Sequence, residues 1–576
     1  MRIVLIALGI VLALAAGFVG WLFFTFQGGD EPIIREPDAA TALVLEQGAL
    51  VGSVEPNGAR AWRGLPFAAA PVGDLRWRAP RPHQGWEGER AAVASGPRCP
   101  QVTNALDRGR GLEPGLLVGR EDCLTLDIYA PTEVENAPVM LWIHGGSNVW
   151  GTAANYDGSF LAQEQGVIVV AVQYRLGPLG WFAHDAIRDD AEGVEDSTAN
   201  FAMMDHVAAL EWVGANIAAF GGDPSRVTIF GESAGGHNVA ALLATPFAEG
   251  LFHRAIIQSG SLDTAPLAVA TGEAAGSDFS SDLAAERMLG DGVEQTAGAL
   301  RGVSLEAVYQ AYRSDGDGGR IEMPRVIADG VSLPVDGIRG ALSRPGDFNA
   351  VPVITGANRD EMKLFNMLDE TLASRVMGFQ FRIEDPALYD ILSDYQGRLW
   401  RILAVDEAAS LMASAGHDAV WAYRFDWDEG GRLVFNDTSS LLGAAHAMEI
   451  PFVFNRFSLF GPLDRALFND GNAEGRAGLA AAMGGYWAGF AGEGRPVASG
   501  QPDWAIYADG RLMRFDSAEG GGPEMIAGAD RRDALIEDLG ADGRLDQDRR
   551  CAIAARLDAF RPNADLQASA RIGCSG

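Results

Sequence analysis

The chain has 576 residues, of which 48% are hydrophobic and 21% charged, so it can bury a large core and is not generally disordered. Its formal net charge of -32 argues against nucleic acid or an anionic membrane surface as a partner, because both are themselves negative. We interpret the acidity as a solvated surface.

The N-terminal segment is apolar from Ile3 to Phe26, with Arg2 before it. The apolar region of a cleaved signal peptide is about 7 to 15 residues long, so the greater length here predicts a membrane anchor within residues 1–29. Cleavage after Ala13-Leu14-Ala15 is the alternative, and it would give a secreted protein. In both cases Arg2 stays inside, and the bulk of the chain is placed outside the cytoplasm.

Residues 30–40 are polar and contain proline, which predicts a short linker. The chain then alternates between runs typical of buried strands and helical segments. We expect strands at 124–129, 139–143 and 167–174, and a long amphipathic helix at 200–216.

The most informative stretch is Val227 to Asn238, VTIFGESAGGHN. Val227 to Phe230 suits a buried strand, and the glycines on either side of Ser233 allow a tight turn that exposes its hydroxyl. A helix from Gly236 to Leu243 would direct its N-terminal amides at the same point. The pattern G-x-S-x-G predicts a nucleophilic serine.

The flanks make this motif specific. Residues 216–224 read NIAAFGGDP and residues 252–261 read FHRAIIQSGS. With these flanks the sequence resembles the type-B carboxylesterase family, and the similarity covers about Val44 to Asp516 with interruptions. The resemblance implies an α/β-hydrolase fold, with a central, mostly parallel twisted sheet flanked by helices, in one catalytic domain at 41–560. Residues 561–576 would be a C-terminal tail.

The resemblance also implies a catalytic triad. Glu361 in GANRDE stands at the position of the acid, and His446 in GAAHAMEIPFVFN at that of the base. With Ser233 they follow the Ser, acid, His order of α/β-hydrolases. Ser259 resembles a hydroxyl that lies near the acid. Asp360 adjoins Glu361, and spacing alone does not choose between them.

The oxyanion hole would come from His144-Gly145-Gly146-Ser147 and the elbow. In the family the second and third glycines of this loop supply amides, which here are Gly146 and Ser147, together with Ala234. Ser147 replaces a glycine, so a positive φ there would add strain. His144 resembles a framework residue rather than the base.

Four cysteines suit an exported chain, because disulfides form in oxidising compartments. The family has its first disulfide at the positions of Cys99 and Cys123, and Cys551 and Cys574 remain as a second pair by elimination. Two structural ion pairs are also implied, Arg76–Glu121 and Arg175–Asp205.

These features together predict a serine carboxylic ester hydrolase that forms an acyl-enzyme and needs no cofactor or metal. A cholinesterase or other narrow member is one alternative, but the loop from Cys99 to Cys123 lacks the aromatic residue with which cholinesterases hold a quaternary ammonium. A silent adhesion protein is another, although all three triad positions are filled. No motif identifies the ester substrate or the oligomeric state.

Overall fold

The computed structural model describes residues 34–574 except 105–106, 108–111, 315–319, 377–379, 434–435, 509 and 561–565. The predicted anchor or signal segment, residues 1–29, therefore lies outside the described residues. Within the described ranges, no helix combines the length and apolar character needed to cross a membrane.

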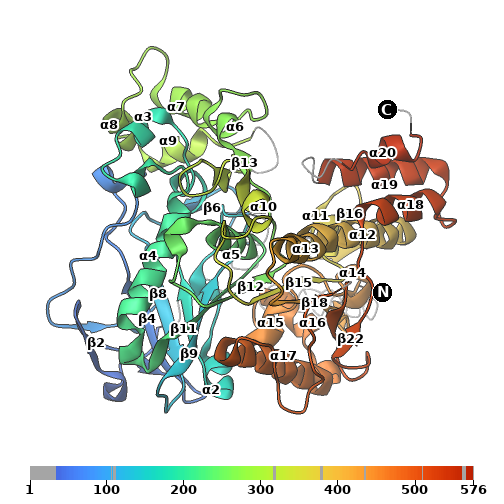
Figure 1. The fold of residues 1–576 in the computed structure, drawn as a ribbon, viewed down its shortest axis with the longest axis horizontal. Helices are drawn as coiled ribbons and strands as arrows, with labels where there is room; N and C mark the ends of the chain where they lie inside the picture. The colour runs from blue at the N-terminus through green and yellow to red at the C-terminus, as the bar shows by residue number, and fades with distance from the viewer. Residues whose placement is uncertain are drawn as a thin grey trace, which may run out of the picture.

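A central sheet of eleven strands organises the chain, as Figure 1 shows. Its seven middle strands run parallel, and antiparallel strands close both edges. The predicted mostly parallel sheet is confirmed. From one edge to the other the strands are β22 (Glu524–Ile526), β21 (Leu512–Phe515), β18 (Val420–Phe425), β15 (Val353–Asn358), β12 (Arg254–Gln258), β11 (Gly222–Glu232), β9 (Ala137–Ile143), β10 (Ile168–Val172), β8 (Thr125–Ala130), β4 (Arg60–Pro66) and β3 (Ser53–Val54).

The middle strands are apolar on both faces because helices cover both. In β9, Val139 and Leu141 belong to one hydrophobic core, while Met140 and Trp142 belong to the other. This alternation follows from the two-residue period of a strand. Continuous apolar runs in the sequence therefore become two cores separated by the sheet.

The helices form a layer on each face (Figure 1). The first core is completed by α4 (Phe201–Asn216), α5 (Ala234–Ala244), α10 (Gly337–Leu342) and α13 (Glu407–Ser414). The second is completed by α2 (Ser159–Gln165), α15 (Ile450–Val453) and α17 (Ala473–Glu493). Shorter helices lie in the connections: α11 (Lys363–Leu368), α14 (Thr438–Leu441) and α16 (Asp464–Leu467).

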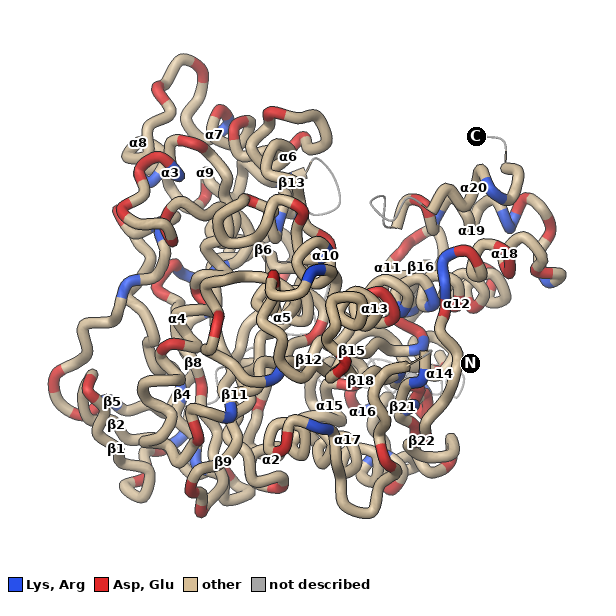
Figure 2. The backbone as a smooth tube through the Cα atoms, in the orientation of Figure 1, with Lys and Arg blue, Asp and Glu red and all other residues tan. Residues whose placement is uncertain are grey.

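A separate lobe stands above the sheet in Figure 1 and has a small core of its own. It contains α3 (Asp185–Asp189), α6 (Leu267–Thr271), α7 (Ser281–Leu289), α8 (Ala297–Arg301) and α9 (Leu305–Gln310). Small sheets join β1 (Leu43–Leu45), β2 (Gly48–Val51) and β5 (Glu89–Ala91), and pair β6 (Gln101–Val102) with β7 (Leu117–Val118), β13 (Ala265–Pro266) with β14 (Ile327–Ala328), β16 (Ala373–Val376) with β17 (Gln380–Ile383) and β19 (Arg432–Leu433) with β20 (Asn436–Asp437). Acidic residues are spread over this lobe and the rest of the chain (Figure 2).

The C-terminal helices pack on α12 (Pro386–Arg401), away from the central sheet. They are α18 (Arg532–Ala541), α19 (Gln547–Phe560) and α20 (Ala568–Arg571). Both predicted disulfides are present, and Cys551–Cys574 joins α19 to the chain end. The boundary predicted at residue 560 thus falls within the segment that this disulfide closes, between Cys551 and Cys574.

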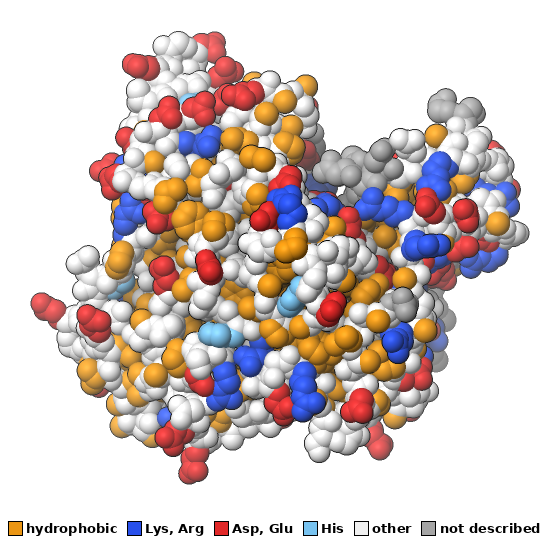
Figure 3. Space-filling model, viewed as in Figure 1, with side chains coloured by type: hydrophobic (Ala, Val, Ile, Leu, Met, Phe, Trp, Pro, Cys, Tyr) orange, Lys and Arg blue, Asp and Glu red, His pale blue; other side chains and the backbone are white. Residues whose placement is uncertain are grey.

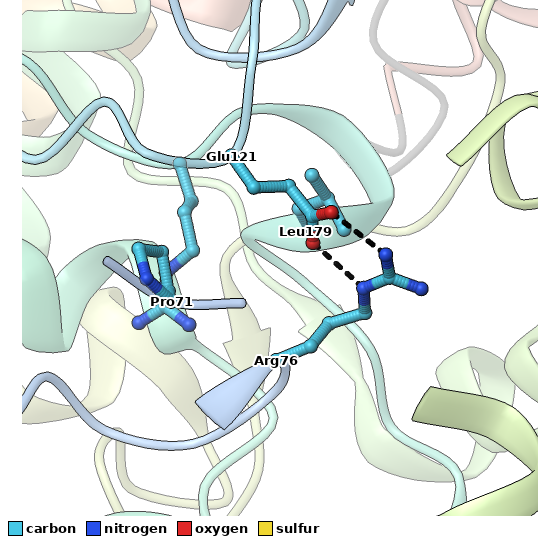
Figure 4. Close-up of a pocket in the computed structure, with 5 residues that line it drawn as sticks. Pro71, Arg76, Glu121 and Leu179 are labelled. Carbon is cyan, nitrogen blue, oxygen red and sulfur yellow. Dashed lines mark hydrogen bonds and ion pairs between the residues drawn. The ribbon is translucent and has the colours of Figure 1, made fainter. Parts of the chain in front are cut away.

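Two predicted ion pairs hold loops near the carboxyl ends of the strands. Arg76 and Glu121 lie 2.6 Å apart and face each other through two parallel hydrogen bonds, as Figure 4 shows. Arg175 follows β10 and binds Asp205 of α4 at 2.6 Å, with both side chains buried. Arg175 also donates to the carbonyls of Arg78 and Phe201, so each nitrogen of its guanidinium has a hydrogen-bond partner.

We predict that Asp205→Asn lowers the free energy of unfolding by about 3–5 kcal/mol, because it leaves the buried Arg175 charge uncompensated. Urea titration measures the loss. Asp336→Asn is the matched control: Asp336 pairs with Arg344 at the surface, and exposed pairs contribute about 1 kcal/mol or less. Equal losses in the two variants would contradict a special role for the buried pair.

Candidate active site

Ser233 lies on a strained turn between β11 and α5. Its φ is 58° and its ψ is -120°, a conformation that costs about 1–3 kcal/mol for a residue with a side chain. The neighbouring glycines are required by close packing, because a Cβ on Gly235 would lie 1.9 Å from the carbonyl oxygen of Ile143. The turn therefore packs closely against the neighbouring strand β9, and Ser233 lies half-buried at the carboxyl end of β11.

Glu361 and His446 form a buried pair beside this turn. Nδ1 of His446 lies 2.5 Å from Oε2 of Glu361, and the glutamate is completely buried. The other oxygen of Glu361 accepts from the Ser259 hydroxyl at 2.5 Å and from the backbone N–H of Asn358 at 2.7 Å. These bonds fix the carboxylate so that it orients the imidazole.

Nε2 of His446 points toward the elbow, where it meets a second carboxylate. It lies 3.1 Å from Oε1 of Glu232, the residue just before Ser233. Burial lowers the pKa of His446, but the charges of Glu232 and Glu361 outweigh it and raise that pKa above its usual value. Burial likewise raises the pKa of the Glu232 carboxyl. An ionised Glu232 would therefore stabilise the imidazolium at Nε2, as Glu361 does at Nδ1, while burial of Glu232 opposes that ionisation.

Sequence reasoning missed four neighbours of His446: Glu232, Glu449, Trp400 and Phe365. Glu232 and Glu449 stand inside the quoted motifs and were available as a signal. The carboxylate of Glu449 is buried and accepts from the side chains of Asn358 and Gln258, and burial raises its pKa. Trp400 lies outside every motif, yet its ring centroid is 4.8 Å from that of His446.

The other candidates for acid and base are engaged elsewhere. Asp360 pairs with Arg359 at 2.7 Å and accepts from the N–H of Ala444, so it anchors the loop that carries His446. Nε2 of His237 lies 2.6 Å from the carbonyl of Asp263. His144 is buried, which lowers its pKa to about 4 and keeps the ring neutral.

The predicted oxyanion loop packs against the serine. A Cβ on Gly145 would lie 3.1 Å from the Cβ of Ser233. Gly146, Ser147 and Asn148 then have φ values of 104°, 53° and 59°, so the serine at the glycine position is strained as anticipated. Among the described residues, no acceptor binds the amides of Gly146 and Ser147. Ala234 begins α5, where helix N–H groups lack partners within the helix.

This sheet, with its sharp strand–serine–helix turn and the histidine loop beyond the later strands, defines an α/β-hydrolase. Solved structures agree. A PNB esterase structure superimposes with a TM-score of 0.67 at 29% identity, covering 85% of this chain and 97% of that one. A carboxylesterase of Geobacillus stearothermophilus gives a TM-score of 0.65 at 28% identity, covering 84% and 97%.

The chain belongs to the carboxylesterase family, whose model matches residues 39–385. It is similar to human cocaine esterase, with 32% identity over 88% of this chain and 90% of the relative. It is also similar to para-nitrobenzyl esterase of Bacillus subtilis (34%; 74% and 86% covered) and to fumonisin B1 esterase of Sphingopyxis macrogoltabida (33%; 88% and 92%). The protein is a carboxylic ester hydrolase.

We predict that Glu232→Gln shifts the acid limb of the pH profile of kcat/KM to lower pH by about one unit or more. The base must be neutral to accept a proton, and removing the Glu232 charge lowers the pKa of His446, so the neutral ring appears at lower pH. Glu449→Gln is the control, since its carboxylate bonds Asn358 and Gln258 and should cause a smaller shift. An unmoved limb in Glu232→Gln would contradict the coupling.

Proposed function

We propose that the protein hydrolyses carboxylic esters through an acyl-enzyme on Ser233. The observation that carries the proposal is the contact between Glu361 and Nδ1 of His446, which directs Nε2 to the elbow. His446 removes the proton of Ser233 as the hydroxyl attacks the ester carbonyl, and Glu361 stabilises the imidazolium. The imidazolium then protonates the leaving alcohol.

The amides of Gly146, Ser147 and Ala234 hold the oxyanion that forms at each tetrahedral step. Their support is the turn of three left-handed residues against Ser233 and the helix that begins at Ala234. Water then attacks the acyl-enzyme with His446 as base, which releases the acid and restores Ser233. Apart from the ester and water, these steps use only groups of the chain itself.

The names of the relatives cover chemically different esters, which supports a general ester hydrolase over a cholinesterase-like member. The two disulfides support a place outside the cytoplasm. We propose further that residues 3–26 anchor the catalytic domain to the membrane. Protein recovered with Ala16 at its N-terminus would show cleavage instead.

Ser233→Ala should lower kcat for p-nitrophenyl acetate by several orders of magnitude, since losing the nucleophile alone costs on the order of a million-fold in a serine protease. In the unchanged protein, an organophosphate should add one adduct per chain, on Ser233, as peptide mass spectrometry would show. Ser261→Ala is the control: its hydroxyl binds Asp263 near the same sheet edge. Full turnover by Ser233→Ala would refute the mechanism.

Glu361→Gln should lose most of kcat and remain folded, because an amide neither favours the working tautomer nor offsets the imidazolium charge. Such a change costs about 10,000-fold in a serine protease. Asp360→Asn is matched in chemistry and adjacent in sequence, and should change thermal stability more than kcat, since Asp360 anchors the loop at Ala444. A folded, inactive Asp360→Asn beside a working Glu361→Gln would reverse the assignment.

A further inference from the structure

The C-terminal arm, which we define as the described residues 530–560 and 566–574, has a hydrophobic core against α12. Leu535, Leu539 and Leu557 of the arm are fully buried with Tyr395 and Leu399 of α12. In Figure 3 this arm and the lobe of α6–α9 project as two separate parts at the top of the view. The arm is thus a packed part of the protein, with its buried side chains held against α12.

Ion pairs fix the position of the arm on the body. Arg398 of α12 binds Asp530 at 2.8 Å and Asp538 at 2.7 Å. Arg549 binds Asp385 at 2.9 Å, just before α12 begins. Arg556 binds Asp369 at 2.8 Å, at the end of α11. These contacts lie at both ends of α12 and at α11. They fix the position of the end of α19 relative to the segment that follows Glu361.

The last turn of α12 carries Trp400 to the candidate active site. Its indole N–H donates to the carbonyl of Ser259 at 3.3 Å, and its ring lies beside that of His446. Residues Ile402–Asp406 continue the helix as a π turn, a distortion that is frequent at functional sites. The side chain of Trp400 is only 8% exposed, so its neighbours determine where the ring lies.

Two phenylalanines complete an aromatic wall of Phe365, Trp400 and Phe560. Phe365 of α11 stacks on Trp400 with centroids 6.0 Å apart, and lies 5.2 Å from His446. Phe560, the last residue of α19, contacts Trp400 at 5.7 Å. Phe365 is 39% exposed, so this apolar residue beside His446 is partly accessible to a ligand.

We propose that the aromatic wall binds a flat, apolar group of the ester and that the C-terminal arm positions it through Phe560. The proposal rests on the proposed function of His446 as base. An aryl group next to His446 would stack on Phe365 and Trp400, and offset stacking contributes beyond the area buried. Phe560 acts through Trp400, so it is a positioning residue for specificity.

The test compares kcat/KM for three esters, measured by pH-stat. Methyl phenylacetate carries the ring on the acyl side, benzyl acetate carries it on the alcohol side, and methyl acetate carries none. In Phe560→Ala, kcat/KM for at least one aryl ester should fall about three- to ten-fold relative to kcat/KM for methyl acetate, mainly because KM rises. Which aryl ester responds identifies the side of the ester that the wall binds.

Phe560→Tyr keeps the ring, so the ratio of kcat/KM for each aryl ester to that for methyl acetate should stay as in the unchanged protein. Phe560→Leu keeps the apolar volume without the ring, and it serves as the test if Phe560→Ala does not fold. Ile572→Ala is the control, because it packs in the arm core without contacting Trp400. The proposal would be overturned if the ratio of kcat/KM for the aryl esters to that for methyl acetate were unchanged in both Phe560→Ala and Phe560→Leu. If only one of the two variants folds, an unchanged ratio in that variant would overturn it. Absence of activity on all three esters in the unchanged protein would instead contradict the proposed function.

Discussion

The candidate site depends on the close packing of one turn, between β11 and α5, against the neighbouring strand β9. Between β11 and α5 the backbone passes so close to β9 that no side chain fits at Gly231 or Gly235, whose Cβ atoms would lie 2.6 Å and 1.9 Å from the carbonyl oxygen of Ile143. Ser233 is left with a positive φ that the surrounding packing sustains. The same packing brings the start of α5 and the loop at Gly146 to one point.

Charge is the second element of this arrangement. Three buried carboxylates, Glu232, Glu361 and Glu449, surround one imidazole. Their charges favour the imidazolium, the form that the proposed mechanism requires of His446 during attack, and burial opposes ionising all three carboxylates. The hydrogen bonds to Glu361 and Glu449 offset part of that desolvation cost, whereas Glu232 has His446 as its charged contact.

The C-terminal arm links a region outside the matched family model to this chemistry. Much of its packing is made with α12, and the last turn of α12 carries Trp400, whose ring lies beside that of His446. The C-terminal arm thereby affects the position of Trp400 at the site without supplying a reacting group.

The sequence by itself determined the elements whose physics is local. The strands at β8 to β11, helix α4, the elbow glycines and the positions of Glu361 and His446 all lie in short stretches whose periodicity or motif is visible along the chain. Only the tertiary structure decided which distant side chains meet. The contact of Glu232 with Nε2, the anchoring of Asp360 at Ala444 and the approach of Phe560 to Trp400 join segments tens to hundreds of residues apart, and their geometry depends on packing that no local pattern encodes.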